Sequence, residues 1–364
     1  MTPRHNAAAL LLGLAAAALS LPTPGLAAQS SDGEPATEVR NPPPLPVAVT
    51  NNAVASLEIA GRTTLFSFLG LGASRTWDGV TQRAFAVALG DSSWTELPPV
   101  PGPRGRIAAT AEAVGGVVVL FGGYTVAPDG SEKSVPNVDI WDPAEGGWRA
   151  AAPMPVPVDD AVSGVWRDSL IYLVSGWHDG DNVSLVQVYD VARDSWQEAT
   201  PIEGVPVFGH AGGVAGDAIV FIDGVRRNDT RPRYTMAPQA WRGDIDPADP
   251  TSITWRPLPE HPGPALYRAA SGVCGDRIVF AGGTDNPYNY DGIGYDGRPA
   301  APRDAVFAYD VGEDRWVDLG AAPASTMDHR GLPVAGGHGF VIGGMRLAQR
   351  VSAGVVVLSL PGCG

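Results

Sequence analysis

The chain reads Val186-Gln187-Val188-Tyr189-Asp190 at the end of one strand-like run, and Trp196 follows after an acidic turn. Runs of the same kind lead to four further tryptophans, which are Trp94, Trp148, Trp255 and Trp316. The intervals between successive tryptophans are 54, 48, 59 and 61 residues. A pattern that recurs at this length predicts a repeat architecture, in which each copy is one supersecondary unit.

A second landmark accompanies the tryptophans, an apolar run that closes on two small residues. Its clearest copy is Val118-Val119-Leu120-Phe121-Gly122-Gly123. Comparable runs occupy 171–176, 219–224, 278–283 and 340–344, and a degenerate one occupies 66–72. The chain therefore contains six units. Short runs rich in Val, Ile, Phe and Tyr, together with 46 glycines and 34 prolines, predict an all-β fold.

These landmarks resemble the kelch repeat, and the resemblance covers roughly residues 44–362. It implies a six-bladed β-propeller with four-stranded blades, in which the tryptophans and Tyr-Asp turns pack between blades. The sixth unit has neither a tryptophan nor an outer strand. Segment 43–49 is similar to 96–101, which follows Trp94. We therefore expect the start of the mature chain to supply the outer strand of the last blade and to close the ring.

The N-terminal residues have the composition of a secretory signal peptide. A basic start precedes an apolar stretch from Ala7 to Leu21, and small residues follow up to Ala28. We predict a signal peptide over 1–28, a flexible leader over 29–43 and the propeller over 44–364. This organisation predicts a periplasmic or secreted protein without a membrane anchor. The formal net charge of −14 argues against binding to nucleic acid.

The two cysteines of the chain are Cys274 and Cys363. An exported protein meets an oxidising compartment, in which disulfides persist. The predicted topology puts both cysteines at the same rim, where a bridge between them would hold the C-terminus. The sequence leaves their separation within that rim open.

Topology also indicates a functional face. In an up-and-down blade, the segment leading into the first strand and the loop after the second strand share one rim, here called the lead-in rim. The opposite rim, here called the turn rim, carries short turns such as 215–217. Polar and aromatic side chains gather at the lead-in rim, and the candidates for a site are Trp77, Arg106, Asp160, His178, His210, Asp229, Arg231, Tyr267, Arg268, His329 and Arg330.

Such a mixture of side chains suits a small carbohydrate or sugar acid. Aromatic faces stack on sugar rings, carboxylates accept hydrogen bonds from hydroxyls, and arginines bind a carboxylate. An alternative is that these charges pair with one another across the channel or serve a contact with another protein. The residue types alone do not decide between the two interpretations.

A six-bladed, exported chain of this kind resembles the N-acetylneuraminate epimerase (sialic acid mutarotase) family. The resemblance implies interconversion of sugar anomers, which needs groups that take and return protons. The family uses a Glu and an Arg in the loop after the small-residue pair of blade four. In loop 223–234 the arginine carries over as Arg231, but no glutamate occurs between Gly204 and Glu260, and Asp229 is the nearest carboxylate.

Under this resemblance the candidates divide into two groups. Arg231, Asp229, His210 and His329 are the expected catalytic residues. The expected substrate-binding residues are Trp77, Arg106, Asp160, His178, Tyr267, Arg268 and Arg330. No cofactor is implied.

Other interpretations stay open. Kelch propellers also serve as non-enzymatic interaction platforms. A copper radical oxidase needs a Cys cross-linked to a Tyr, together with two His copper ligands. This class of enzyme is disfavoured, because Cys274 lies at the turn rim and Cys363 at the chain end. A metal site of Asp160, His210 and His329 has no short ligand spacing, so no metal is predicted.

Overall fold

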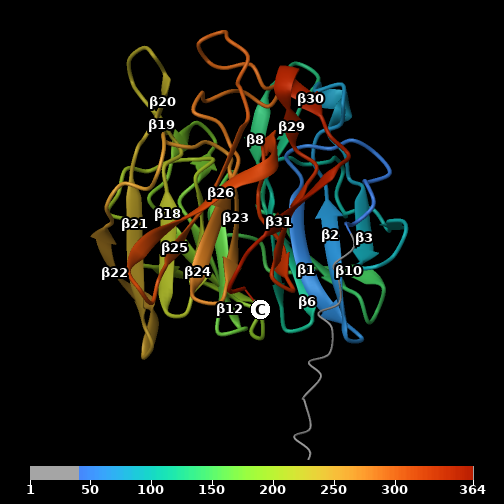
Figure 1. The fold of residues 1–364 in the computed structure, drawn as a ribbon, viewed down its shortest axis with the longest axis horizontal. Helices are drawn as coiled ribbons and strands as arrows, with labels where there is room; N and C mark the ends of the chain where they lie inside the picture. The colour runs from blue at the N-terminus through green and yellow to red at the C-terminus, as the bar shows by residue number, and fades with distance from the viewer. Residues whose placement is uncertain (1–40, 364) are drawn as a thin grey trace, which may run out of the picture. The chain divides into compact units, whose positions relative to one another are not determined.

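The computed structural model describes residues 41–363, and they form six antiparallel sheets around a central axis (Figure 1). Each sheet is one blade, and its strands run from the axis outward in chain order. Apart from two short 3-10 turns, the regular elements of these residues are strands. The predicted all-β, six-bladed propeller is confirmed. The predicted signal peptide and nearly all of the predicted leader lie outside the described residues.

The first three blades have four strands each. Blade one contains β1 (Ala53–Ile59), β2 (Arg62–Phe68), β3 (Ala84–Ala88) and β4 (Thr95–Leu97). Blade two contains β5 (Thr110–Val114), β6 (Val117–Phe121), β9 (Val138–Asp142) and β10 (Gly147–Ala150). Blade three contains β11 (Val162–Trp166), β12 (Leu170–Val174), β15 (Val186–Asp190) and β16 (Ser195–Ala199).

The other three blades follow the same plan. Blade four contains β17 (Ala211–Ala215), β18 (Ala218–Ile222), β21 (Ala240–Asp246) and β22 (Asp249–Pro257). Blade five contains β23 (Ala270–Cys274), β24 (Arg277–Ala281), β25 (Arg303–Asp310) and β26 (Arg315–Thr326). Blade six has three described strands, β27 (Val334–Ala335), β28 (His338–Ile342) and β31 (Val355–Ser359).

Two-stranded hairpins extend the loops of the lead-in rim, at the upper end in Figure 1. They pair β7 (Tyr124–Val126) with β8 (Glu132–Ser134) and β13 (Trp177–His178) with β14 (Asp181–Asn182). The other two pair β19 (Val225–Arg227) with β20 (Tyr234–Met236) and β29 (Met345–Arg346) with β30 (Arg350–Val351). The 3-10 turns are η1 (Trp77–Gly79) and η2 (Leu347–Gln349).

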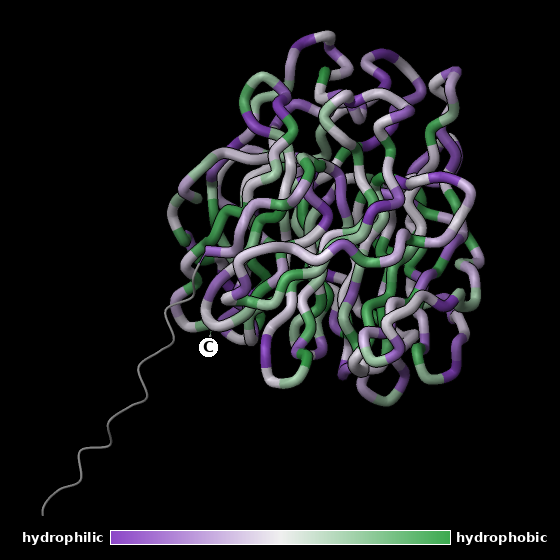
Figure 2. The backbone as a smooth tube through the Cα atoms, turned by 90° about the vertical axis from the view of Figure 1, so that its right-hand side faces the viewer, coloured by the Kyte–Doolittle hydropathy of each residue, from purple (hydrophilic) through white to green (hydrophobic). Residues whose placement is uncertain are grey.

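The apolar core is divided among the blade interfaces. Among the clusters of buried apolar side chains in the described residues, six lie between neighbouring blades, one at each interface. Phe221, for example, lies fully buried between blades three and four. Burial of one such side chain contributes about 2–3 kcal/mol. In Figure 2, hydrophobic positions concentrate in the strands and hydrophilic ones in many of the loops.

The tryptophans of the repeat join neighbouring blades. Each indole N–H donates to a backbone carbonyl that follows the outer strand of the preceding blade: Trp148 to Pro98, Trp196 to Ala152, Trp255 to Thr200 and Trp316 to Pro259. The tryptophan of blade one, Trp94, donates to Pro43 at 2.8 Å. Pro43 therefore occupies the position that follows the outer strand of blade six, and Leu45 N–H bonds to Ala353 at 2.7 Å. This agrees with closure of the ring by the N-terminal segment, but residues 43–49 form no regular strand of blade six, contrary to the expectation from the sequence.

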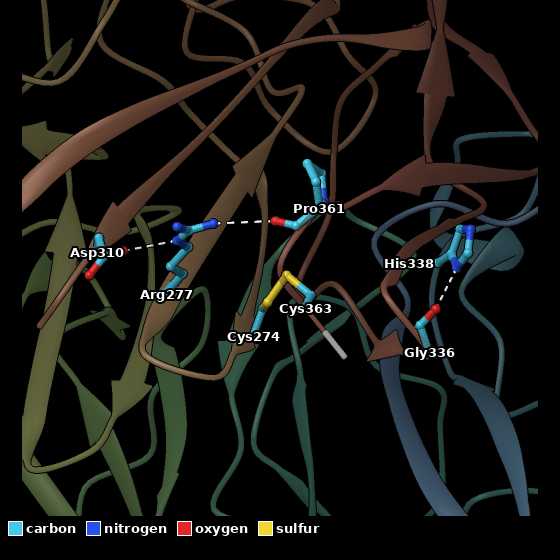
Figure 3. Close-up of a disulfide and its surroundings, with 7 residues drawn as sticks. All are labelled: Cys274, Arg277, Asp310, Gly336, His338, Pro361 and Cys363. Carbon is cyan, nitrogen blue, oxygen red and sulfur yellow. Dashed lines mark hydrogen bonds and ion pairs between the residues drawn. A yellow bond between two sulfur atoms is a disulfide. The ribbon is translucent and has the colours of Figure 1, made fainter. Parts of the chain in front are cut away.

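The disulfide that the sequence left open is present. Cys274 ends β23 and Cys363 follows β31, and their Cα atoms are 5.3 Å apart (Figure 3). Arg277 lies beside the bridge and pairs with Asp310 at 2.9 Å. The bridge ties the end of the chain to blade five. Among residues 41–363, no helix is long and apolar enough to span a bilayer.

A buried ion pair links blades four and five. The carboxylate of Asp223 accepts hydrogen bonds from His261 Nε2 at 2.6 Å and from the N–H of Leu266 at 2.8 Å. The imidazole of His261 stacks on Phe307 with ring centroids 4.9 Å apart. Burial opposes the charged imidazolium, but the hydrogen bond to Asp223 and its charge raise the pKa of His261.

This pair predicts a pH-dependent contribution to stability. Because the pKa of His261 is raised on folding, the contribution is complete below about 6.5, its unfolded value, and is lost as pH rises through the folded value. His261→Gln keeps a donor but removes the charge. At pH 5.5 we expect the variant to be less stable than the wild type by about 1 kcal/mol or more. Urea unfolding should show this difference shrinking towards pH 9, and a constant difference would contradict the account.

Candidate polar ring and rim cleft

The six blades are joined around the axis by a ring of backbone hydrogen bonds. Each lead-in segment contains one residue in the left-handed conformation, with φ between 52° and 72°: Asn51, Ala108, Asp160, Gly209, Arg268 and Asp328. Backbone hydrogen bonds of 2.8–3.1 Å join these segments. The N–H groups of Asp160, Gly209 and Arg268 donate to the carbonyls of Ala108, Asp160 and Gly209, in that order. The N–H groups of His329 and Asn51 donate to the carbonyls of Arg268 and Asp328. The side-chain oxygen of Asn51 accepts from the Ala108 N–H at 2.6 Å and completes the ring.

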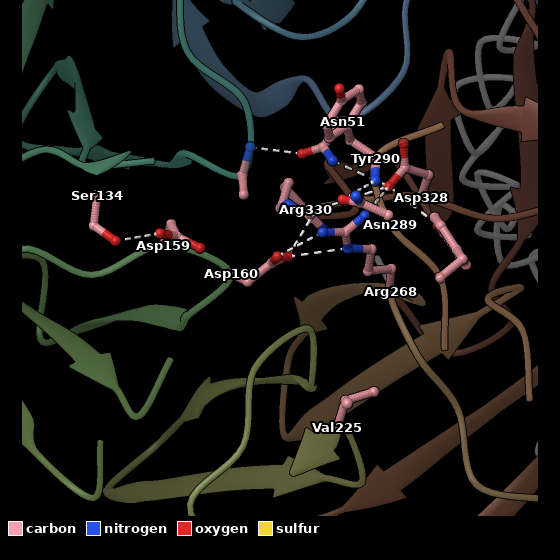
Figure 4. A network of polar contacts seen from close by, with 12 residues as sticks. Asn51, Ser134, Asp159, Asp160, Val225, Arg268, Asn289, Tyr290, Asp328 and Arg330 are labelled. Atoms are coloured by element: carbon pink, nitrogen blue, oxygen red, sulfur yellow. Dashed lines mark hydrogen bonds and ion pairs between the residues drawn. The ribbon is translucent and has the colours of Figure 1, made fainter. Parts of the chain in front are cut away.

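The side chains of Asn51, Asp160, Arg268 and Asp328 converge and, together with Arg330, pair with one another (Figure 4). The guanidinium of Arg268 donates to both oxygens of Asp160, at 3.2 and 2.7 Å, and to Asp328 at 3.1 Å. Arg330 Nη2 lies 2.7 Å from Asp160 Oδ1. These side chains are at most 4% exposed, so the charges are desolvated and depend on each other.

The pKa values of these groups follow from that pairing. Burial disfavours the charge of Arg268, but the carboxylates, first that of Asp160, raise its pKa well above the usual value. Burial likewise opposes the Asp160 carboxylate, yet Arg268 and Arg330 hold its pKa below the usual value. Neighbouring Asp159 has no such partner, and burial and the charge of Asp160 raise its pKa well above the usual range.

Asp328 is the best-satisfied carboxylate of the ring. Besides Arg268, it accepts hydrogen bonds from the Thr50 hydroxyl at 2.7 Å, the Asn51 amide at 3.1 Å and the Tyr288 hydroxyl at 3.0 Å. Thr50 and Asn51 were not among the residues selected from the sequence. The register of blade one would have identified Asn51, because it stands where Asp160 and Asp328 stand in their blades.

Gly209 has no side chain, and the aromatic ring of Tyr267 occupies the space beside it. A Cβ at Gly209 would lie 2.1 Å from the ring of Tyr267. Tyr267 is fully buried and lies beside the guanidinium of Arg268, 4.8 Å from its ring centroid. The predicted substrate-binding residues Asp160, Tyr267, Arg268 and Arg330 are thus brought together. The structure pairs the three charged ones with each other, as in the alternative interpretation of the sequence.

The two histidines predicted to be catalytic lie next to this ring and are neutral at neutral pH. His210 Nε2 bonds to the Val174 carbonyl at 2.9 Å, and burial lowers the pKa of His210 to about 4. Burial and the neighbouring Arg330 lower the pKa of His329 to about 3. Residues 41–363 contain no group of three His, Cys, Asp or Glu side chains placed to hold a metal ion, so Asp160, His210 and His329 do not form one.

The remaining predicted residues are dispersed over the lead-in rim. Arg106 is buried and pairs with Asp139, away from the axis. Trp77 is 43% exposed in η1, and His178 Nδ1 contacts the Pro157 carbonyl at 2.6 Å. The side chain of Asp229 is 94% exposed and pairs with Arg227. The structure does not bring Trp77, Arg106, His178 and Asp229 to one place.

Arg231 lines a cleft on the lead-in rim, here called the rim cleft, with a volume of about 880 Å³. One wall is the β19–β20 hairpin and the other is the long loop of blade five. The lining residues are Arg231, Pro232, Arg233, Tyr234, Thr235, Met236, Asn286, Pro287, Tyr295 and Asp296. Clefts of this size are typical binding sites for small molecules.

The rim cleft combines cationic, aromatic and polar groups. The rings of Tyr234 and Tyr295, one from each wall, contact each other, with centroids 4.2 Å apart. Asn286 donates to Asp296 at 3.3 Å. Within the described chain, neither Arg231 nor Arg233 makes a side-chain hydrogen bond or ion pair. Two unpaired guanidiniums beside one carboxylate make the cleft locally cationic.

Of these lining residues only Arg231 was assigned a role from the sequence. Asn286, Tyr295 and Asp296 belong to a loop that has no counterpart of similar length in the other blades, so alignment of the repeats gives no register for it. Its excess of Asn, Tyr and Asp was the available signal.

Comparisons with known proteins agree with the fold. The model of the kelch motif matches residues 105–155. Human kelch-like protein 15 is 27% identical over 133 residues, which cover 36% of this chain and 22% of the human protein. Kelch-like protein terF of Aspergillus terreus is 28% identical over 251 residues, which cover 65% of this chain and 51% of the fungal protein. The chain thus spans about half or less of the length of these relatives.

A solved structure of YjhT is also similar. It matches with a TM-score of 0.70 over 88% of this chain and 97% of that chain, at 16% identity. At this identity the likeness shows the fold alone. The kelch match, the six sheets and this structural likeness together identify the chain as a kelch-repeat, six-bladed β-propeller.

Proposed function

We propose that this propeller is exported and binds a small sugar acid in the rim cleft. The observation that carries the proposal is the pair of unpaired arginines, Arg231 and Arg233, beside the rings of Tyr234 and Tyr295. A guanidinium binds a carboxylate through two parallel hydrogen bonds. The tyrosine rings offer faces for a sugar ring, and Asp296 and Asn286 accept hydrogen bonds from hydroxyls.

Export is supported by two features. The sequence predicts a signal peptide over 1–28, and the Cys274–Cys363 bridge suits an oxidising compartment.

Loss of Arg231 is expected to weaken binding of N-acetylneuraminate at least roughly tenfold, because one charge-assisted hydrogen bond contributes about 1.5–3 kcal/mol. Isothermal titration calorimetry of the wild type, Arg231→Ala and Arg233→Ala measures this effect. Arg226→Ala is the matched control, because Arg226 is exposed on the same hairpin but does not line the rim cleft. Equal affinities for the wild type, Arg231→Ala and Arg233→Ala would contradict the proposal.

Mutarotation is the finer hypothesis for this site. Ring opening needs a proton acceptor at the anomeric hydroxyl and a donor at the ring oxygen. Asp296 is the carboxylate of the rim cleft, and its pKa is lowered first by the hydrogen bond from the Arg298 N–H, so it is available as an acceptor. NMR of freshly dissolved N-acetylneuraminate should show faster anomeric exchange with the wild type than with Arg231→Ala or Asp296→Asn. Unchanged exchange would leave a binding protein without this activity.

A second candidate is contact with another protein on the same rim. Trp77, Tyr295 and Leu347 are large apolar residues with exposed fractions of 43%, 42% and 68%, and all three lie in loops of the lead-in rim. Exposed apolar side chains on one face are a feature of interaction surfaces. If the protein binds no sugar acid, a partner that loses affinity with Leu347→Ser would favour this candidate.

A further inference from the structure

A cavity of about 280 Å³ occupies the central channel of the propeller. The innermost strands or the segments beside them line it in all six blades, and it ends against Asp160 and Arg330 of the polar ring. At its other end the cavity reaches Val273, the second-last residue of β23, near the turn rim. The side chain of Val273 is 38% exposed. The channel cavity shares no lining residue with the rim cleft. It is a separate site, and the following inference does not depend on the proposed function.

One acidic side chain in the channel wall departs from the repeat pattern. Glu112 stands in β5, four residues after the left-handed residue of its blade. The corresponding residues of the other blades are small or apolar, namely Ala55, Gly164, Gly213, Gly272 and Leu332. The repeat therefore does not need a carboxylate there to build the blade. A local departure from the pattern of a fold is expected where function imposes a different residue.

The carboxyl of Glu112 has a hydroxyl partner but no cation. Ser163 of β11 donates to Glu112 Oε1 at 2.5 Å, and Ser163 also contacts the Thr110 hydroxyl. Within residues 41–363, no Lys, Arg or His forms an ion pair with Glu112, and its Oε2 makes no hydrogen bond. Asp160, by contrast, has two arginines. Glu112 thus presents an unpaired oxygen to the cavity it lines.

Burial raises the pKa of Glu112 to about 7, and the Ser163 hydrogen bond opposes this shift. The other titratable groups in the cavity wall are Asp160, His210, His329 and Arg330, and all lie at the closed end. Of the strands packed against β5, β1 carries Glu58 and β11 is followed by Asp168, and both are exposed. The charge of Glu112 therefore changes near neutral pH, and a bound cation would stabilise the ionised form.

We propose that the central channel binds a small organic ammonium ion whose nitrogen pairs with the carboxylate of Glu112. The wall mixes the aliphatic side chains of Val54, Val214 and Val273 with serine hydroxyls, which suits a short aliphatic body. The volume equals that of about nine waters at roughly 30 Å³ each, enough for a molecule of this size. The net charge of −14 also attracts cations to the protein.

The test uses n-butylammonium chloride as the probe and n-butanol as its uncharged isostere, with binding to the full chain measured by ligand-observed NMR at pH 6 and pH 8. The wild type should bind butylammonium saturably and roughly tenfold tighter at pH 8, because the ionised fraction of a group with a pKa near 7 rises about tenfold. Butanol should bind at least about tenfold more weakly than butylammonium.

Glu112→Gln should reduce butylammonium affinity at least roughly tenfold and remove its pH dependence. Because this change removes a charge that burial disfavours, the variant should unfold at no lower temperature than the wild type at pH 8, which verifies that it is folded. The matched control is Glu198→Gln, an exposed glutamate on the outer strand β16, which should bind like the wild type. The proposal is overturned if Glu112→Gln binds like the wild type, if butanol binds as well as butylammonium, or if no saturable binding occurs.

Discussion

Arg268→Met is expected to lower the free energy of unfolding by about 3–5 kcal/mol, because it removes one partner from a buried ionic network. The side chain of Arg268 is 3% exposed and donates to Asp160 and Asp328. Methionine has a similar length but no charge, so Asp160 and Asp328 would lose their shared cation while staying buried. These ion pairs lie in the ring where all six blades meet, so their loss affects more than one blade interface.

Urea unfolding at neutral pH measures this effect, with Arg193→Met as the matched control. Arg193 also pairs with an aspartate, Asp190, but its side chain is 79% exposed. Exposed ion pairs contribute about 0–1 kcal/mol, so the control should change little. An Arg268→Met protein as stable as the control would show that the polar ring does not hold the blades together.

Cys363→Ser is expected to destabilise the folded protein by about 4 kcal/mol, because the bridge to Cys274 closes a loop of 89 residues in the unfolded chain. A cross-link over such a separation removes much of the conformational entropy of the unfolded state. Cys363 is partly exposed whereas Cys274 is 5% exposed in an apolar cluster, so substitution at Cys363 leaves the packing less disturbed.

The double variant supplies the control for this prediction. Cys274→Ser with Cys363→Ser breaks the same single bridge, so its loss should be close to that of Cys363→Ser and well below the sum of the two single losses. Reducing agent should lower the stability of the wild type to the level of the variants. A change below about 1 kcal/mol in Cys363→Ser would mean that the bridge does not restrain the chain end.

The fold could be predicted because its determinants repeat. Trp94, Trp148 and Trp196 recur after equivalent turns, and each makes the same kind of hydrogen bond to the preceding blade. Closure was readable in part: segment 43–49 looks like the segment after Trp94 and Pro43 takes the equivalent position, but residues 43–49 form no regular strand. Because the six units can be aligned with one another, the sequence of this chain alone is enough to identify the fold.

The polar ring was predictable only in part. Register placed Asp160 and Arg268 at one rim, and the structure brings them together. Their mutual pairing depends on the direction in which each left-handed residue projects its side chain across the axis, and no local pattern encodes that direction. Asn51 was missed because the first copy of the repeat is degenerate.

The other sites could not be assembled from the sequence. The rim cleft joins Arg231 of blade four to Tyr295 of a long loop in blade five, so it exists only once two non-repeating loops are placed side by side. Glu112 differs from its counterparts in a single strand, and its importance depends on the cavity beside it. His210 and His329 looked reactive by residue type, yet their low pKa values follow from burial beside the ring.

The rim cleft and the polar ring are connected by aromatic contacts. Tyr267 lies beside Arg268, Phe208 contacts Tyr267 at 5.7 Å between centroids, and Phe208 contacts Tyr234 at 6.0 Å. Tyr234 then forms the wall of the cleft opposite Tyr295. The buried charges therefore support the cleft indirectly, and the unpaired arginines of the cleft are those on the hairpin.

A crystal structure of the protein in complex with N-acetylneuraminate would show directly where the ligand binds. We expect the sugar carboxylate within about 3 Å of the guanidinium of Arg231 or Arg233, and the sugar ring against Tyr295. Asp160, Arg268 and Asp328 should keep their mutual contacts. Ligand bound among those three residues, with the rim cleft empty, would contradict the assignment of the site.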